Sequence, residues 1–165
     1  MPPPLRAAAA FGVSYRPMTD HDLPFAAALY ASTRHEELAQ TGWPDELQHA
    51  FLAQQFEAQH RHYRQHYPNA EWLIVERAGE RIGRLYIDEW GREFRIIDIA
   101  LIPSSRGAGV GGAIVADVLA EGAAAAKVVS IHVEKENPAM RLYRRLGFVP
   151  VDEHGAYDLM EWAPS

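Results

Sequence analysis

The sequence contains no cysteine among its 165 residues. Disulfide bonds, metal sites built on thiolates and a cysteine nucleophile are therefore excluded. A chain without disulfides fits a reducing compartment, so we expect a cytoplasmic protein. Long apolar runs are also missing. None approaches the roughly 20 residues that a membrane-spanning helix needs, and we expect no membrane partner.

Positively charged residues are also relatively few. Lys and Arg number 16 against 22 Asp and Glu, which gives a formal net charge of −6. Proteins that bind nucleic acid through its phosphates generally carry a basic surface, so we expect no nucleic-acid partner. A negative surface mildly favours cationic partners such as amines.

What the chain does contain is typical of one globular domain. Apolar residues make up 48% and charged residues 23%. The three prolines at positions 2–4 and the short apolar stretch after them predict a disordered lead-in over residues 1–12. No repeat or linker divides residues 13–165, which we expect to form a single domain.

The hydrophobic pattern of the first half predicts one strand, two helices and a meander. A strand at 13–17 leads into Thr19-Asp20-His21-Asp22, which matches a helix capping box. A helix through residues 25–30 follows. The second helix, at 44–66, has an expected buried stripe made of Leu47, Phe51, Leu52, Phe56 and Tyr63. Three strands then form an antiparallel meander, at 71–76, 82–87 and 94–102.

The second half alternates strands and helices. A helix through 110–119, a strand at 128–134 and a helix opened by Asn137-Pro138 precede two closing strands, at 148–151 and 157–162. The strand–turn–helix–strand unit around Gly107 requires one parallel strand pair. The predicted fold class is therefore α/β. Its sheet is mixed and mostly antiparallel, with flanking helices and one parallel β-turn-α-β unit.

A glycine-rich turn lies between a predicted strand and a predicted helix. Residues 106–112 read Arg-Gly-Ala-Gly-Val-Gly-Gly, so backbone N–H groups can approach a ligand closely. The helix N-terminus adds unpaired N–H donors and partial positive charge, which suits phosphate, and Arg106 adds a full charge. A tight packing turn is the simpler alternative, but the strand–turn–helix context favours anion binding.

Two other phosphate-binding motifs compete with this interpretation. A P-loop needs Gly-Lys followed by Ser or Thr, which the turn lacks. Gly107, Gly109 and Gly112 do satisfy G-x-G-x-x-G, and Glu134 ends the next strand, where a dinucleotide fold places a ribose-binding acid. The short stretch after Glu134 is too small for the rest of such a sheet. An NAD-binding oxidoreductase is therefore a lesser alternative.

Two motifs together resemble those of one enzyme family. Residues Arg106 to Gly111 fit the [Q/R]-x-x-G-x-[G/A] motif of the GNAT N-acetyltransferases. The stretch from Asn137 to Phe148 resembles their later N-x-x-x-x-x-Y…G-F segment. Both motifs lie on the right elements in the right order, and the element order extends the resemblance over most of the chain.

The resemblance implies a site for acetyl-CoA as cosubstrate. It implies that backbone groups of the strand before the turn hold the pantetheine arm, at Ala100, Leu101 and Ile102. It implies that the turn binds the pyrophosphate, through Arg106, Gly107, Ala108, Gly109, Val110, Gly111 and Gly112. Asn137 is implied to contact the pantetheine side, and Tyr143 to act as general acid near the sulfur. Many members carry a basic residue where this chain has Ala108.

The general base is open on sequence grounds. Ser130, His132 and Glu134 alternate along one predicted strand and share a face, and Asp98 lies on the neighbouring strand. We take Glu134 and His132 with Tyr143 as the catalytic set, although each polar residue has an ordinary structural interpretation. Strand placement alone suggests Tyr86, Asp88 and Trp90 as lining of an acceptor pocket.

Two basic clusters have simpler interpretations. The histidines around the end of the second helix, including His62 and His66, lie on a solvated face, so we predict no metal site. Arg141, Arg144 and Arg145 can reach the 3′-phosphate of the cofactor, but a basic face on a short helix is common.

The sequence therefore predicts an N-acetyltransferase that moves an acetyl group from acetyl-CoA to a primary amine by direct attack. The alternative from another class is a non-catalytic CoA-binding sensor. The acceptor amine is not identified, and a homodimer is left open.

Overall fold

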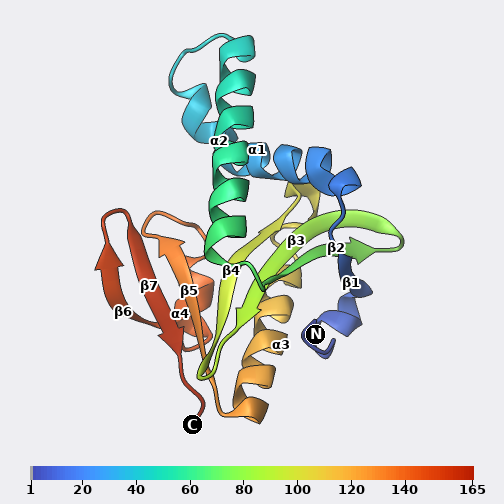
Figure 1. Cartoon of the computed structure of the whole chain (residues 1–165), viewed down its shortest axis with the longest axis vertical. Helices are drawn as coiled ribbons and strands as arrows, with labels where there is room; N and C mark the ends of the chain where they lie inside the picture. Colours follow the sequence, from blue (N-terminus) through green and yellow to red (C-terminus); the bar gives the residue numbers. More distant parts are fainter. Residues whose placement is uncertain (1) are drawn as a thin grey trace.

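One seven-stranded sheet runs through the structure, a computed structural model that describes residues 2–165 (Figure 1). Its strand order is β1-β2-β3-β4-β5-β7-β6, and every neighbouring pair is antiparallel except β4 with β5. The strands are β1 (Val13–Pro17), β2 (Glu71–Arg77), β3 (Glu80–Glu89), β4 (Glu93–Leu101), β5 (Val128–Glu134), β6 (Val149–His154) and β7 (Tyr157–Trp162). The predicted fold class is confirmed, and a doubly wound dinucleotide fold, which needs a mostly parallel sheet, is excluded.

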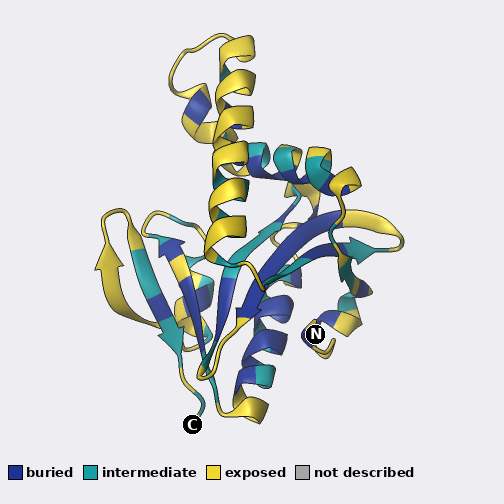
Figure 2. Ribbon diagram, in the orientation of Figure 1, coloured by how far each residue is buried: buried dark blue, intermediate teal, exposed yellow. Residues whose placement is uncertain are grey.

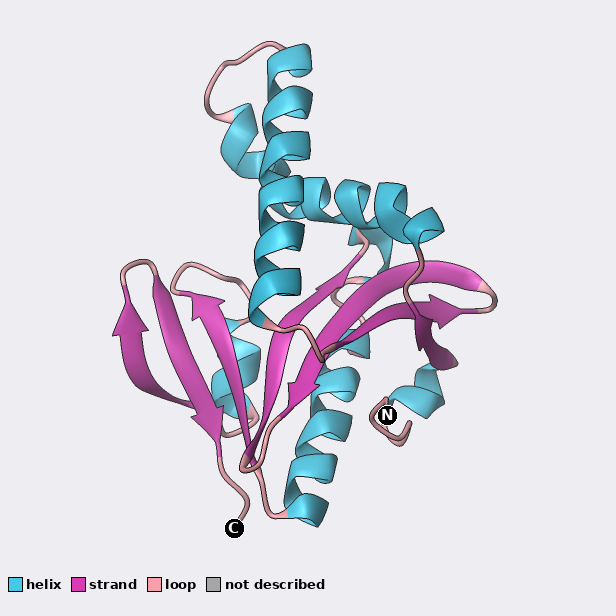
Figure 3. Ribbon diagram, in the orientation of Figure 1, coloured by secondary structure: helices cyan, strands magenta, loops and turns pink. Residues whose placement is uncertain are grey.

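Helices flank both faces of this sheet (Figure 3). The α-helices are α1 (Leu23–Ala39), α2 (Asp45–His66), α3 (Val110–Ala125) and α4 (Met140–Arg145). Three short 3₁₀ helices are η1 (Ala8–Phe11), η2 (Asp20–Asp22) and η3 (Pro103–Ser105). In Figure 1, α1 and α2 lie on one side of the sheet, with α3 and α4 on the other. No helix in the described part of the chain is both long enough and apolar enough to span a membrane.

The main core lies between the sheet and α3. It includes Leu85 and Ile96 of the sheet with Ile114 and Val118 of α3, all fully buried. A smaller cluster joins α1 to α2. The expected buried stripe of α2 is only partly right, because Leu52 and Phe56 are buried whereas Leu47 is 49% exposed and Phe51 36% exposed. Figure 2 shows that the first half of α2 projects beyond the sheet and that most of its residues are exposed.

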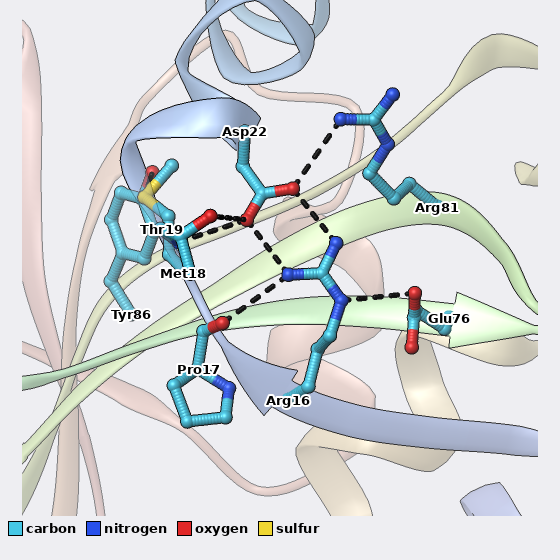
Figure 4. A network of polar contacts seen from close by, with 8 residues as sticks. All are labelled: Arg16, Pro17, Met18, Thr19, Asp22, Glu76, Arg81 and Tyr86. Atoms are coloured by element: carbon cyan, nitrogen blue, oxygen red, sulfur yellow. Dashed lines mark hydrogen bonds and ion pairs between the residues drawn. The ribbon is translucent and has the colours of Figure 1, made fainter.

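The start of α1 is held by the predicted capping box. Thr19 N–H donates to the Asp22 carboxylate at 2.9 Å. Arg16 of β1 grips the same carboxylate through two nitrogens at 2.7 and 2.8 Å, and Arg81 adds a third contact at 3.3 Å (Figure 4). This network fixes α1 relative to the β1–β3 edge of the sheet.

The N-terminal segment differs from the predicted disordered lead-in. Residues 8–11 form η1, which lies against α3 with Ala8 fully buried and Phe11 half-buried, while the other residues of 6–12 are exposed. The cause is Asp117 of α3, whose carboxylate accepts N–H groups of Arg6, Ala7 and Ala8. Met1 lies outside the described residues.

Candidate functional site

A bulge in β4 opens the sheet at its centre. Tyr86 of β3 pairs with Asp98, whereas Ile87 pairs with Ile96, so Ile97 is an extra residue in β4. Bulges bend the strand that carries them. The parallel pairing of β4 with β5 runs from Glu93–Val128 to Ile96–Ile131, and the two strands diverge beyond that point (Figure 1). We call the gap between residues 97–101 and 132–134 the strand opening.

Backbone groups of β4 face the strand opening at alternate positions. Ile102 N–H donates to Ile82 of β3 at 2.8 Å. Because hydrogen-bonded and non-bonded residues alternate in antiparallel pairs, Ala100 also bonds toward β3, while Ile99 and Leu101 face the opposite way. Of the three backbone positions predicted, only Leu101 therefore faces the opening. Sequence reasoning missed Ile99, because the bulge that sets this alternation has no sequence signal.

The glycine turn lies where the sequence placed it, between β4 and α3. Gly107 and Gly109 have φ angles of 76° and 93°, which glycine adopts without the cost that other residues incur. Ala113 N–H donates to Gly109 in the first helical bond, at 3.0 Å. The N–H groups of residues 110–112 precede that bond and therefore have no acceptor within the helix. Unpaired N–H groups at a helix start are donors suited to an anion, and we call this part of the helix the anion-binding end of α3.

The Arg106 guanidinium links the turn to two other elements. Its Nε donates to the Leu101 carbonyl at 2.8 Å, and a terminal nitrogen donates to Ser32 Oγ of α1 at 2.9 Å. The expected charge therefore lies at the end of β4, beside the strand opening. Ser32 also borders a cleft of about 450 Å³ between α1, α2 and η3, whose polar lining includes His35, Asp45 and His49.

Tyr143 is a buried phenol on α4, with 5% of its surface exposed. Burial, and then the negative charge of Asp98, raise its pKa to about 12. Its hydroxyl therefore keeps its proton across the physiological range. The C-terminus of α4 is closed at Gly147, which has φ 104°, and Phe148 N–H donates back to Tyr143 at 3.0 Å.

Asn137 lies just before α4. Its Oδ1 accepts Ala139 N–H at 2.8 Å, so it caps the turn that leads into the helix. The α-helix itself begins at Met140, slightly later than the predicted start at Pro138. With Oδ1 engaged, the amide nitrogen of Asn137 is the group that can donate to a ligand.

Asp98 lies immediately after the bulge, on the face of the sheet covered by α2. Its carboxylate accepts hydrogen bonds from Arg84 at 2.8 Å and from Tyr63 of α2 at 3.2 Å. The side chain is 15% exposed, while that of Arg84 is 3% exposed. A buried arginine therefore holds this carboxylate at the edge of the strand opening.

The two predicted bases on β5 have other partners. His132 Nδ1 lies 3.3 Å from a terminal nitrogen of Arg95. Since arginine is always a donor, Nδ1 accepts, and the neutral ring carries its proton on Nε2. Burial, and then Arg95 and His154, lower the pKa of His132. Ser130, the third residue of this face, donates to Glu93 and accepts from Arg95.

Glu134 is held by an ion pair with Arg34 of α1. The Arg34 hydrogen bond is the largest influence on its pKa, which is lowered despite partial burial. A carboxylate with a lowered pKa is a weaker base, so this contact favours a structural role for Glu134.

The remaining predicted positions lie around this centre. Tyr86 is buried beside Asp98, whereas Asp88 and Trp90 bond to each other at 2.9 Å near the β3–β4 turn, away from the strand opening. Among residues 2–165, no group of three or more His, Asp or Glu is arranged to hold a metal ion. Arg141, Arg144 and Arg145 are exposed on α4.

Comparisons with known proteins agree with this geometry. Residues 32–148 match the model of the acetyltransferase (GNAT) family. No curated protein matches the chain by sequence. Solved structures do match, including the PaiA N-acetyltransferase from Thermoplasma acidophilum in complex with coenzyme A. Its TM-score is 0.68 at 13% identity, and the match covers 92% of this chain and 98% of that one.

Two further structures have the same fold. A GNAT family acetyltransferase from Elizabethkingia anophelis with acetyl-CoA bound has a TM-score of 0.59 and 16% identity, covering 92% of this chain and 98% of that one. An acetyltransferase from Thermus thermophilus has a TM-score of 0.65 and 15% identity, covering 92% of this chain and 96% of that one.

Proposed function

Because the chain belongs to the GNAT acetyltransferase family, we propose that it is an N-acetyltransferase that uses acetyl-CoA and a primary amine. One observation carries the proposal: the strand opening lies directly beside the anion-binding end of α3. The ligands of the Thermoplasma and Elizabethkingia structures, coenzyme A and acetyl-CoA, support it further.

The residues present fit such a cosubstrate. A pyrophosphate needs clustered N–H donors, which the start of α3 supplies, and a Cβ built on Gly107 would meet nothing within 4 Å among the described residues. The amide groups of a pantetheine arm need unpaired strand edges, and the backbone of Ile99 and the N–H of Leu101 supply one, while Arg106 holds the Leu101 carbonyl. Asn137 can donate from its amide nitrogen, and the exposed arginines of α4 suit a 3′-phosphate.

The bound thioester supplies an activated acetyl group. Around it, backbone N–H of Ile99 or Leu101 would stabilise negative charge on the carbonyl oxygen. Tyr143 would hold a proton at its hydroxyl and release it to the departing sulfur, because its raised pKa keeps the phenol protonated until then. The chain has no cysteine that could form an acyl-enzyme, so we propose that the amine attacks the thioester directly.

Asp98 is the group that we propose to accept the proton from the amine, directly or through water. It lies at the bulge, and its charge contributes to the raised pKa of Tyr143. The negative charge of Asp98 therefore acts on the proposed acid. An arginine contacts each of the three candidate bases, Arg84 at Asp98, Arg95 at His132 and Arg34 at Glu134, so it is the position at the bulge that favours Asp98.

Two measurements, made one after the other, test the proposal. The first is thermal unfolding with acetyl-CoA and, separately, with NADH. A ligand at 100 times its Kd adds about 2.7 kcal/mol of stability, and we expect this only with acetyl-CoA. Absence of that shift would contradict the cosubstrate.

The second measurement is thiol release from acetyl-CoA across a panel of amines. It should include diamines, amino acids and a lysine peptide, with Tyr143→Phe as the control. Amine-dependent release supports the transferase. Binding without release from any amine favours the CoA-binding sensor instead.

A further inference from the structure

Asp117 is a buried carboxylate in the middle of α3, with 2% of its surface exposed. Its Oδ1 accepts the N–H of Ala7 at 2.7 Å, and its Oδ2 accepts those of Arg6 and Ala8, both at 3.0 Å. Hydrogen bonds to a charged group are roughly twice as strong as neutral ones. One side chain therefore ties the start of η1 to the helix that follows the glycine turn.

The other end of η1 reaches the turn itself. A Cβ built on Gly109 would lie 3.3 Å from Cζ and 3.7 Å from Cε1 of Phe11. Apart from chain neighbours, no other described atom comes within 4 Å of that position. Gly109 is the N-cap of α3, where the turn becomes helix. Phe11 therefore supplies the packing against this residue, whereas Gly107 faces open space.

We propose that residues 6–11 form an N-terminal clasp, which fixes the turn at residues 106–109 for phosphate binding. Asp117 holds the clasp on α3, and Phe11 of the clasp packs beside Gly109. Both are therefore positioning residues. The inference rests on the proposed function, since it assigns the turn to a phosphate ligand. A turn that is already ordered loses less conformational freedom on binding, which strengthens affinity without any added contact.

The clasp lies outside the segment that matches the family model, residues 32–148. Asp117 and the clasp are also more than a hundred residues apart in the sequence, so only the fold brings them together.

The test compares four variants with the unmodified protein: Phe11→Ala, Phe11→Leu, Asp117→Asn and Glu121→Gln. Glu121 is the matched control, because it meets the Arg6 side chain at 3.5 Å from the same helix. The readouts are the Kd for coenzyme A by calorimetry, kcat and KM for acetyl-CoA, and amide hydrogen exchange over residues 107–112.

We expect Phe11→Ala and Asp117→Asn to raise Kd and KM about five- to tenfold, with kcat within about twofold of the original value. Amides at the turn should exchange faster. Phe11→Leu, which keeps an apolar side chain, should recover most of the affinity. Glu121→Gln should match the unmodified protein in all three readouts.

The proposal is overturned if Phe11→Ala melts cooperatively yet binds coenzyme A as tightly as before. If Asp117→Asn fails to fold, the comparison of Phe11→Ala with Phe11→Leu still tests the proposal. If the unmodified protein binds no coenzyme A, the proposed function fails instead. Amide exchange then tests the clasp alone, and unchanged exchange in Phe11→Ala overturns it.

Discussion

Arg34 of α1 donates to the carboxylate of Glu134 at 2.6 Å, joining a helix on one face of the sheet to the end of β5. Tyr157 of β7 donates to the same oxygen at 3.2 Å. Glu134 of β5 is thus bonded to both α1 and β7 beside the strand opening. The contact with Arg34 explains the lowered pKa of Glu134. It favours a role in holding α1 over a role in accepting a proton.

Glu134→Gln distinguishes these roles. A general base contributes typically 10²–10⁴-fold to a rate, whereas a holding contact contributes far less. We expect kcat/KM to fall by less than about tenfold, because the amide still accepts a hydrogen bond from Arg34. The pH profile of kcat/KM should keep its acidic limb. A loss of a hundredfold together with that limb would restore Glu134 as the base.

Tyr143→Phe is expected to reduce kcat by about 10²–10³, because the phenol's proton is lost while the ring's packing against Phe148 is kept. The Kd for coenzyme A should change little. Since the pKa of Tyr143 is raised to about 12, deprotonation of this residue should not limit the rate below about pH 11. An alkaline limb near pH 9 that disappears in Tyr143→Phe would contradict that assignment.

Asp98→Asn tests the other side of the opening. We expect kcat to fall by about 10²–10⁴, the range typical for the loss of a general base. Arg84 is 3% exposed and would lose its charged partner, so stability should fall as well. Steady-state kinetics well below the melting temperature separate the two effects. A fully active Asp98→Asn enzyme would show that the amine loses its proton elsewhere.

The sequence predicted those parts of the fold that depend on local signals. The strands at 128–134 and 157–162 and the capping box at Thr19 follow from short-range patterns, and the structure has each of them. The glycine turn was found for the same reason, because it lies within one strand–turn–helix unit.

Features that depend on distant residues were missed. The bulge at Ile97 is set by register against β3, so the sequence did not show that the backbone of Ile99 faces the opening. The ordered N-terminal segment depends on Asp117, and the roles of Glu134 and His132 depend on Arg34 and Arg95. A sequence pattern names such side chains without showing which ones pair.

Two histidines make the free energy of unfolding depend on pH below about 6.5. Burial, the largest influence, lowers the pKa values of His60 and His132, so the folded state binds fewer protons than the unfolded state. Stability is therefore full above the unfolded value near 6.5 and declines as pH falls below it. Urea midpoints at pH 7.5 and 5.5 measure the decline.

A double variant, His60→Gln with His132→Gln, should show a smaller difference between these two pH values. His35→Gln, at an exposed position of α1, controls for the substitution itself. An undiminished decline in the double variant would mean that other groups cause it.

Asp22→Asn tests the network that anchors α1 (Figure 4). The carboxylate is 2% exposed, and the hydrogen bond from Arg16 is the largest influence holding its pKa below the usual range. The arginines left behind, Arg16 and Arg81, are 35% and 41% exposed, so the loss is mainly that of hydrogen bonds to a charged group. Because Arg16 also keeps its contact with Glu76 at 3.0 Å, we expect about 1.5–3 kcal/mol by urea unfolding at pH 7.

The pH dependence of this loss follows from the sign of the shift. A carboxylate with a lowered pKa stabilises the fold above its unfolded value near 3.9, and that stabilisation disappears as pH falls through the folded value. The gap between the original protein and Asp22→Asn should therefore be constant from pH 5 to 8 and narrow in acid. Glu76→Gln, which removes the more exposed partner of Arg16, should cost less than about 1 kcal/mol. Equal losses from the two substitutions would show that the burial of Asp22 does not set the strength of the network.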